Sequence, residues 1–282
     1  MLTHEDMDKT APGGVYLCQV NDNVSCGACC GLYNVADLSR EKLNQMLSDR
    51  TDTFLNIARE IDAIVEFGEN ILAAQTKTRP YPEFYHCPYI GFIGKNGKRV
   101  GCLLHPAAEG NKNVDYRGLG YYGSMTCNIY FCPSYTNVSD NFKRLIRDAS
   151  QDWYSYGLLI TESVLINAFL TEAEKRIQRK IDEENIRLNP DFAGVVREFI
   201  NLKASWPFRP ASDTPANYFF KDKLYAKKDN DYSKTRSSSF TSRFDTILKE
   251  LGSSFQTDEE IKQAEAMIES LLKKFQESTA NV

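Results

Sequence analysis

The sequence predicts an α+β fold made of an irregular, cysteine-rich N-terminal half and a predominantly α-helical C-terminal half. All eight cysteines of the 282-residue chain lie between Cys18 and Cys132. Glycine and proline interrupt the segments that carry them, which is typical of turns and short strands. After them, apolar residues recur at helical spacing. We therefore divide the chain into a cysteine-cluster region over residues 1–138 and a helical region over 139–282.

In the first region, Ser39 is a plausible N-cap for a helix that uses Leu43, Met46 and Leu47 on one face. A second helix is predicted after it, with one apolar face made by Phe54, Ile57, Ala58, Ile61, Ile64 and Val65. The glycine-rich stretch between Cys87 and Cys102 predicts a β-hairpin whose two ends meet.

In the second region, helical spacing runs from about Phe142 to Arg187, and Asn189-Pro190 stops it. A further helix is predicted over residues 192–202, and residues 210–243 are irregular. Thr257 and Glu260 form a capping box for a last helix. The apolar face of that helix consists of Ile261, Ala264, Ile268, Leu271, Leu272 and Phe275.

Composition excludes several classes of protein. The formal net charge is −4, so no global field favours nucleic acid or an anionic membrane. Residues 1–14 lack the pattern of a secretory signal, and the most apolar stretch, 158–170, is too short to span a bilayer. Eight cysteines are too few for a disulfide scaffold of this length. We expect a cytoplasmic protein with reduced thiols and no membrane or nucleic-acid partner.

The central motif is Cys26-Gly27-Ala28-Cys29-Cys30-Gly31. A Cys-x-x-Cys step lets the chain turn back so that two sulfurs can point at one metal ion, and Gly27 tolerates the dihedral angles required. Cys30 projects in a different direction from Cys29. It could serve a second ion, complete a polynuclear cluster or simply pack.

Further ligands follow in His86-Cys87-Pro88, Gly101-Cys102 and the later pair Cys127 and Cys132. The candidate metal ligands are thus Cys26, Cys29, Cys30, Cys87, Cys102, Cys127 and Cys132. Among them Cys30 and Cys132 are secondary ligands or supports. For Cys18 we favour the role of a small buried hydrophobic residue over that of a ligand. The two histidines beside this set, His86 and His105, read better as satisfied polar residues than as ligands.

A thiolate-rich site favours zinc or an iron–sulfur cluster over calcium or magnesium. We favour an iron–sulfur cluster of the 4Fe–4S kind, because adjacent cysteines and surplus thiols suit a cluster better than one tetrahedral zinc ion. If the metal is zinc, its expected role is structural.

These motifs resemble the YkgJ-type cysteine-cluster family of bacteria, which is described as chelating zinc or iron. The resemblance rests on Cys26-Gly-Ala-Cys-Cys, Cys87-Pro-Tyr-Ile, Gly101-Cys-Leu-Leu-His-Pro and Cys127, and covers residues 18–135. Where the family has a further cysteine, this chain has Asn23. A relative of the family, the flagellin lysine N-methylase, carries a similar cysteine set with an iron–sulfur cluster. The resemblance thus implies a second hypothesis, a protein-modifying enzyme that uses the cluster and S-adenosylmethionine.

A third hypothesis is a scaffold protein in which zinc only stabilises the fold and the helices bind partner proteins.

Three other features favour ordinary structural roles. The segment Asp115–Ser124 could present Arg117 or Tyr121 to a substrate, but a structural loop is the better interpretation. The basic residues of 221–243 favour a solvated loop over a nucleic-acid contact. Glu162 lies in a predicted apolar helix, and we expect it on the solvent-facing side of that helix. The alternative is a buried carboxyl group with a raised pKa.

Overall fold

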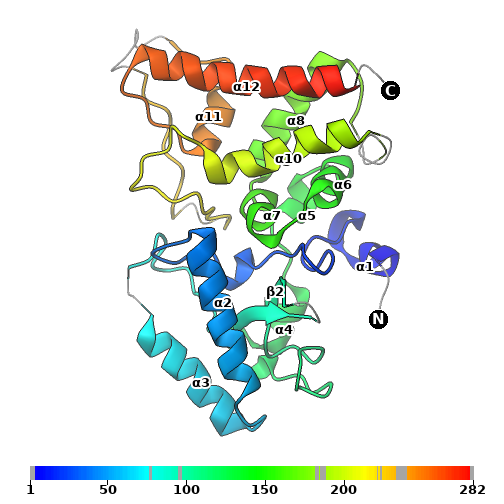
Figure 1. The fold of residues 1–282 in the computed structure, drawn as a ribbon, viewed down its shortest axis with the longest axis vertical. Coiled ribbons are helices and arrows are strands. Elements are labelled where there is room, and N and C mark those ends of the chain that lie inside the picture. Colours follow the sequence, from blue (N-terminus) through cyan, green and yellow to red (C-terminus); the bar gives the residue numbers. More distant parts are fainter. Residues whose placement is uncertain are drawn as a thin grey trace. The chain divides into compact units, whose positions relative to one another are not determined.

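The computed structural model describes residues 4–75, 78–94, 97–181, 184, 189–220, 222, 224–232 and 240–279. Its contacts divide the chain into two compact units. The cysteine unit comprises Tyr16–Cys132 and Gln151–Gly157, and the helical unit comprises Met1–Val15, Pro133–Ser150 and Leu158–Val282. The described chain is mostly helical and contains one two-stranded sheet, in agreement with the expected α+β class (Figure 1).

The cysteine unit holds the sheet. Its elements are η2 (Ala28–Cys30), α2 (Arg40–Leu55), α3 (Ile61–Ala74), β1 (Ile90–Ile93), β2 (Arg99–Cys102), η3 (Arg117–Leu119), α4 (Gly123–Ile129) and the first part of α7 (Trp153–Ile160). Strands β1 and β2 pair antiparallel, and α2 packs along β1 (Figure 1). The hairpin expected between Cys87 and Cys102 is therefore confirmed.

A small apolar core joins these elements. It consists of Phe54, Ile64, Phe67, Tyr89, Leu103 and Leu104, which are all buried. The rings of Phe54 and Phe67 meet edge to face with their centroids 5.2 Å apart. The Tyr89 hydroxyl donates to the carbonyl oxygen of Ile64 at 3.1 Å, so this buried tyrosine keeps a partner for its polar atom.

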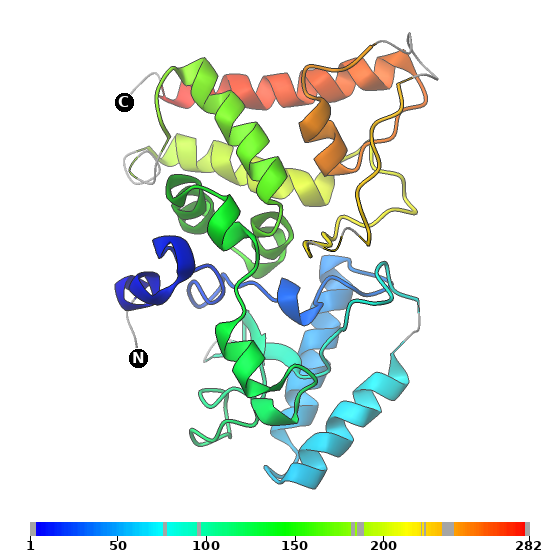
Figure 2. The ribbon, with the colours of Figure 1, turned by 180° about the vertical axis from the view of Figure 1, so that it is seen from behind.

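The helical unit contains α1 (His4–Thr10), η1 (Pro12–Gly14), α5 (Ser134–Asn137), α6 (Asp140–Ala149), the end of α7, α8 (Ser163–Ile177), α10 (Pro190–Ser205), α11 (Asp245–Leu251) and α12 (Asp258–Thr279). Helix α12 packs against α8 and α10, and α11 packs against α8 (Figure 2). Phe169 and Phe199 stack at 4.2 Å between ring centroids, and Phe275 meets Phe169 edge-on. These aromatic rings form the centre of the unit.

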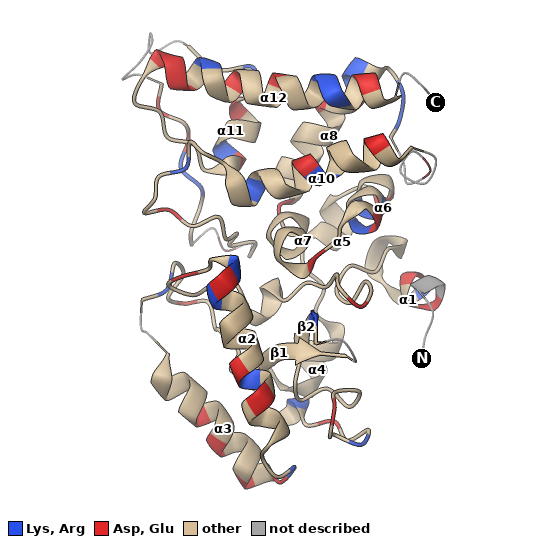
Figure 3. Cartoon of the chain, in the orientation of Figure 1, with Lys and Arg blue, Asp and Glu red and all other residues tan. Residues whose placement is uncertain are grey.

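The last helix follows its sequence signals closely. The amide of Glu260 bonds to the Thr257 hydroxyl, and the Glu260 carboxylate accepts from the amide of Thr257, each at 3.2 Å. This is the expected capping box. The six residues of the expected apolar face are buried. The outer face of α12 carries both acidic and basic residues along its length (Figure 3).

Two boundaries differ from expectation. Helix α3 begins only at Ile61, because Arg59 donates to the carbonyls of Phe54 and Ile57 and so satisfies the end of α2. Asn189 starts a helix, since its side chain accepts from the amides of Asp191 and Phe192. The single helical run expected from Phe142 to Arg187 is wrong: it is divided into α6, α7 and α8, and α8 ends at Ile177, where Gln178 takes the left-handed conformation. Residues 182–183 and 185–187 of that expected run lie outside the described residues. No helix within the described ranges has both the length and the apolar character needed to cross a membrane.

Candidate metal centre

A short turn at η2 brings adjacent cysteines close to a distant segment. After it, Gly31 has a φ of 74°, and a Cβ there would lie only 2.3 Å from the carbonyl oxygen of Tyr85. Only glycine therefore fits this position. The close approach lets the amide of Cys87 donate to the carbonyl oxygen of Cys30 at 2.9 Å. The turn thus places Cys30 beside Cys87.

Cys18 lies beside Cys26 on a second tight loop. Gln19 and Ser25 form an isolated antiparallel bridge, and the amide of Cys26 donates to the carbonyl oxygen of Cys18 at 2.8 Å. The side-chain oxygen of Asn21 accepts from the amides two and three residues later, each at 2.9 Å, and so closes the loop. Sequence reasoning left Cys18 out of the candidate site. The turn signal Asn21-Asp-Asn between two short extended segments could have placed it there.

The hairpin brings two more cysteines to one end of the sheet. Cys102 is the last residue of β2 and lies opposite Ile90. Past this pair, the amide of Leu103 donates to the carbonyl oxygen of Tyr89 at 2.9 Å, so the chain next to Cys87 runs beside the chain next to Cys102. Both cysteines pack against the apolar core of the cysteine unit.

The last two cysteines lie on the segment that ends this unit. Cys127 is on α4 and is exposed, whereas Cys132 is half-buried. Tyr85 stacks on Tyr121 with 4.5 Å between ring centroids and meets Tyr122 edge-on. These rings tie the start of α4 to the chain that precedes the hairpin.

Burial and neighbouring thiols shift the pKa values of the cysteines. Burial raises the pKa of Cys87 to about 12, and Cys102 adds to the effect. Burial raises the pKa of Cys102 to about 11. A hydrogen bond between the thiols of Cys29 and Cys30 holds the pKa of Cys29 below its ordinary value and raises that of Cys30. The thiol of Cys102 raises the pKa of Cys87 because the two groups would repel as thiolates.

Backbone amides donate hydrogen bonds to four of the sulfurs. The amide two residues later donates to three of them: Ala28 to Cys26, Tyr89 to Cys87 and Leu104 to Cys102. Cys102 also accepts from the amide of His105, and Cys29 accepts from its own amide and that of Cys30. These bonds oppose the effect of burial, because they favour the charged form of the sulfur. Amide donors at four of the thiols thus favour the thiolate form, while burial favours the neutral thiol more strongly at Cys26, Cys87 and Cys102.

A buried cation lies beside the cysteines. Arg50 on α2 is 4% exposed, and its guanidinium donates to the carbonyl oxygen of Cys87 at 3.2 Å. Burial lowers the pKa of Arg50 to about 10, and the Cys87 thiol acts in the opposite direction. No carboxylate of the described residues forms an ion pair with it. A buried guanidinium without a counter-ion is costly, so this environment favours a negative charge at the cysteines.

The two nearby histidines have structural partners. The Nδ1 atom of His86 lies 2.7 Å from the carbonyl oxygen of Gly31, and burial lowers the pKa of His86 to about 3, aided by Arg50. The Nε2 atom of His86 has no hydrogen-bond partner among the described residues. The Nδ1 atom of His105 accepts from the amide of Ala107 at 3.1 Å, which supports the turn after β2.

All eight cysteines lie in the cysteine unit. Among the described residues, which include these eight, no three His, Cys, Asp or Glu side chains are arranged so that they could hold a metal ion. The structure therefore makes the candidate cysteines neighbours of one another without drawing their sulfurs to a single point. Convergence of Cys26, Cys29, Cys87 and Cys102 on one centre stays a prediction.

The glycine- and tyrosine-rich segment over residues 115–124 makes internal contacts. Arg117 forms a bidentate ion pair with Asp115, with nitrogen–oxygen distances of 2.9 and 2.7 Å. The hydrogen bond to Arg117 lowers the pKa of Asp115 to about 2. Tyr121 is stacked on Tyr85 yet 74% exposed. Arg117 thus pairs with Asp115 within the loop, which agrees with the interpretation of this segment as a structural loop.

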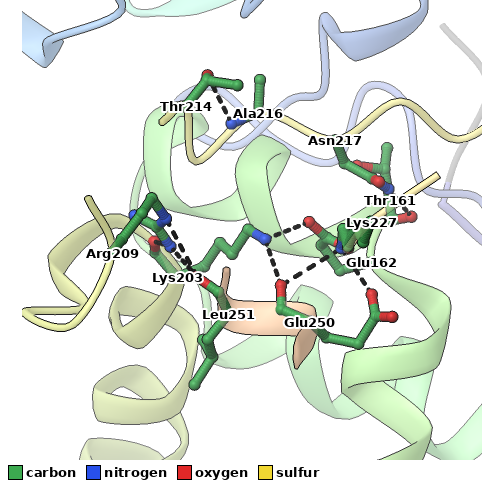
Figure 4. Close-up of polar contacts among 10 residues, drawn as sticks. All are labelled: Thr161, Glu162, Lys203, Arg209, Thr214, Ala216, Asn217, Lys227, Glu250 and Leu251. Atoms are coloured by element: carbon green, nitrogen blue, oxygen red, sulfur yellow. Dashed lines mark hydrogen bonds and ion pairs between the residues drawn. The ribbon is translucent and has the colours of Figure 1, made fainter. Parts of the chain in front are cut away.

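The helical unit has a separate buried polar cluster, which the sequence did not reveal. Glu162 is 2% exposed, so the expected position on a solvent face is wrong. Its two carboxylate oxygens lie 2.6 Å from the Lys203 ammonium and 2.5 Å from the Lys227 ammonium (Figure 4). Lys227 also pairs with Glu250 at 2.6 Å. Two acids and two bases thus satisfy one another.

The pKa values of this cluster follow from its pairing. Burial alone would raise the pKa of Glu162, but Lys203 and Lys227 outweigh it and hold the pKa below the ordinary value. Burial lowers the pKa of Lys203 to about 8 even though Glu162 acts against it. The alternative of a buried acid with a raised pKa is therefore also wrong. The cluster joins α8, α10, α11 and the irregular segment before α11, a structural role.

Comparisons with known proteins add no relative. No family model, no curated protein and no solved structure matches the chain. The resemblance to the YkgJ-type family rests on the cysteine motifs alone.

Proposed function

We propose that the cysteine unit binds a metal centre through its thiolates, and that this centre is an iron–sulfur cluster in preference to zinc. The observation that carries the proposal is the gathering of all eight cysteines in one compact unit from four separate stretches of chain. Soft thiolate ligands select zinc and iron–sulfur clusters. More thiols are present than one tetrahedral zinc ion takes, which favours a cluster.

Local hydrogen bonding supports this proposal. The amides of Ala28, Tyr89 and Leu104 donate to cysteine sulfurs two residues earlier. A neutral buried thiol is a weak hydrogen-bond acceptor and is stabilised little by such donors. A metal-bound thiolate is stabilised by them, and they tune the reduction potential of a cluster.

Charge provides the second support. Arg50 brings a buried positive charge to within hydrogen-bonding distance of the Cys87 backbone. Four thiolates around an iron–sulfur cluster or a zinc ion carry net negative charge. Such a centre would supply the counter-ion that the described carboxylates do not.

The proposal requires the sulfurs to move together when metal binds, since no three of them are close enough to hold an ion. Metal binding commonly drives such local folding. Cys127 lies on α4, a helix of seven residues whose Met125 and Ile129 are exposed, so few apolar contacts oppose its movement toward the other cysteines. Thiolate ligands require reduced cysteines, so we propose a reducing compartment, the cytoplasm.

Anaerobic purification of the full chain, followed by absorbance and by iron, sulfide and zinc analysis, tests the proposal. We expect a brown protein with broad visible absorption and acid-labile sulfide. A colourless protein with stoichiometric zinc would retain the thiolate site and reverse the preference for a cluster. A chain that holds neither metal after anaerobic reconstitution, with all eight thiols reactive toward an alkylating reagent, would overturn the proposal.

A further inference from the structure

The buried polar cluster of the helical unit takes three of its charged groups from helices and one from an irregular segment. Glu162 is the N-cap residue of α8, Lys203 lies on α10 and Glu250 lies on α11. Helix α11 packs against α8. Lys227 comes instead from residues 224–232, which contain no helix or strand (Figure 4). The helices therefore fix three groups, and the irregular segment supplies the fourth.

The ammonium of Lys203 holds the fixed part of the cluster together. It lies 2.6 Å from Oε1 of Glu162 and donates to the main-chain carbonyl oxygen of Glu250, also at 2.6 Å. Arg209 donates to the carbonyl oxygens of Lys203 and Leu251, at 2.7 and 2.8 Å, and so joins the ends of α10 and α11. The three fixed charges are two carboxylates and one ammonium. Among them, one negative charge is left to be balanced by a further cation.

Three oxygen atoms surround one position, and the ammonium of Lys227 occupies it. Its Nζ atom lies 2.5 Å from Oε2 of Glu162, 2.6 Å from Oε2 of Glu250 and 3.3 Å from the main-chain carbonyl oxygen of Glu250. A primary ammonium group has three N–H donors, one for each of these acceptors. A guanidinium group holds its donors in a flat, rigid fork instead. Charge and hydrogen bonding therefore both favour a primary ammonium group at this position.

The segment over residues 226–231, which carries this ammonium, has weak attachments otherwise. None of its six side chains is both apolar and buried. Asp229 pairs with Lys249 at 2.6 Å, but the Asp229 side chain is 90% exposed. Asn230 donates to the Asp245 carboxylate at 2.8 Å. Exposed ion pairs contribute little to stability, and segments with few buried apolar contacts open locally at low cost.

We infer that the site made by Glu162, Lys203 and Glu250 binds a primary alkylammonium group, such as that of a lysine side chain. Lys227 is its internal ligand, and residues 226–231 are a lid that closes when the Lys227 ammonium is seated. When the lid opens, the fixed groups regain their unbalanced negative charge and take the ammonium group of another molecule. This inference does not depend on the metal proposed for the cysteine unit.

Acetylation of the lysines in the unmodified chain, followed by mass spectrometry, tests the lid. Lys228 is exposed beside Lys227, and Lys143 is fully buried elsewhere in the helical unit, so the two are internal references. We expect Lys227 to react more slowly than Lys228 but at least about tenfold faster than Lys143, because the lid opens without unfolding the helices. Equal rates for Lys227 and Lys143 would overturn the lid. Equal rates for Lys227 and Lys228 would overturn the site, because its ammonium would not be seated.

Replacing the internal ligand tests the class of ligand. Lys227→Ala removes the ammonium and three of the four carbons of the lysine stem, and n-propylammonium supplies these atoms as a free ion. We expect the variant to unfold at a lower temperature than the unmodified chain, and propylammonium to raise its midpoint in a saturable way. Tetramethylammonium at the same ionic strength has no N–H donor and should not raise the midpoint. Lys249→Ala is the matched control, since Lys249 pairs with an exposed carboxylate, and its midpoint should not respond.

Equal responses of the two alanine variants to propylammonium, or no response in either, would overturn the ammonium site. If Lys227→Ala does not fold in buffer, refolding takes the place of the midpoint. Folding in propylammonium and not in tetramethylammonium then supports the site, and folding in neither overturns it.

Discussion

At the scale of single residues, two of the buried charged groups among the described residues, Glu162 and Arg50, have opposite surroundings. Glu162 is enclosed by two lysines in the helical unit. Arg50 is enclosed in the cysteine unit, where it interacts with the Cys87 thiol and with His86 and forms no ion pair with a described carboxylate. Burying a charge is tolerable only when a partner compensates it. The first residue therefore reports on stability, and the second on what the cysteines bind.

We predict that Glu162→Gln lowers the free energy of unfolding by about 3–5 kcal/mol, because it leaves the buried ammonium of Lys203 without its carboxylate. Urea unfolding followed by circular dichroism measures the change. Glu198→Gln is the matched control, since Glu198 pairs with Lys274 on the surface at 2.6 Å with both side chains about half exposed. It should change stability by less than about 0.5 kcal/mol. Equal effects of the two substitutions would contradict the buried role of Glu162.

The same residue sets a dependence on acid. The pKa of Glu162 is raised by burial but lowered further by its lysines, so it lies below that of an unfolded glutamate, about 4.3. The stabilisation is therefore complete above pH of about 4.3 and is lost as the pH falls through the lower, folded pKa. Thermal unfolding between pH 7 and pH 2.5 should show this loss in the unmodified chain. In Glu162→Gln the part of this loss that comes from Glu162 should be absent. If the variant loses stability with falling pH as steeply as the unmodified chain, Glu162 is not the group responsible.

We predict that Arg50→Met weakens metal binding by about 10- to 100-fold, the usual cost of losing a group that supports metal ligands. Competition with a chelator measures it. In the metal-free chain the same substitution is neutral or stabilising, because it removes a buried charge without a carboxylate partner. Arg40→Met, on the same helix, is the control, since Arg40 pairs with Asp152 and is 47% exposed. If Arg50→Met leaves metal affinity unchanged, the electrostatic support for the proposed function fails.

At the scale of elements, local signals predicted the hairpin, α2 and α12, and distant contacts decided the rest. The start of α3 was missed because Arg59 ends α2 through its side chain, which no periodicity shows. Glu162 was assigned to the surface because Lys227, which buries it, comes 65 residues later in the chain. For the candidate site, the sequence selected every cysteine except Cys18. It could not show which cysteines are neighbours, because that depends on how the turn at η2 and the hairpin β1–β2 meet.

That meeting is testable at Gly31. Gly31→Ala should lower both stability and metal content, because its Cβ would lie 2.3 Å from the Tyr85 carbonyl oxygen and push the turn away from Cys87. Gly97→Ala is the control, since Gly97 also has positive φ but nothing within 4 Å of an added Cβ. The control should cost only the left-handed strain of about 1–2 kcal/mol and keep the metal. Equal metal content in both variants would show that the contact does not position the site.

At the scale of the whole molecule, each unit has its own apolar core and the chain passes between them more than once. The buried ammonium of Lys143 holds the N-terminal segment to the helical unit, because it donates to the carbonyl oxygens of Gly13 and Tyr135, each at 2.9 Å. Residues 151–157, in contrast, belong to the cysteine unit. These assignments depend on contacts between residues that are far apart in the sequence. Dividing the chain once, at residue 138, therefore could not predict them.

Separate cores predict separate responses to metal. Because every cysteine lies in the cysteine unit, removing metal with a chelator should lower the stability of that unit and leave the helical unit unchanged. Hydrogen exchange read by mass spectrometry distinguishes the two. Amides of the hairpin β1–β2 and of α4 should exchange faster after chelation, whereas those of α8, α10 and α12 should not. The Cys87→Ser, Cys102→Ser variant should show the faster exchange of the hairpin even with metal present. Equal acceleration in both units would mean that the metal stabilises the chain as one cooperative body, and unchanged exchange everywhere would mean that the cysteine unit folds without it.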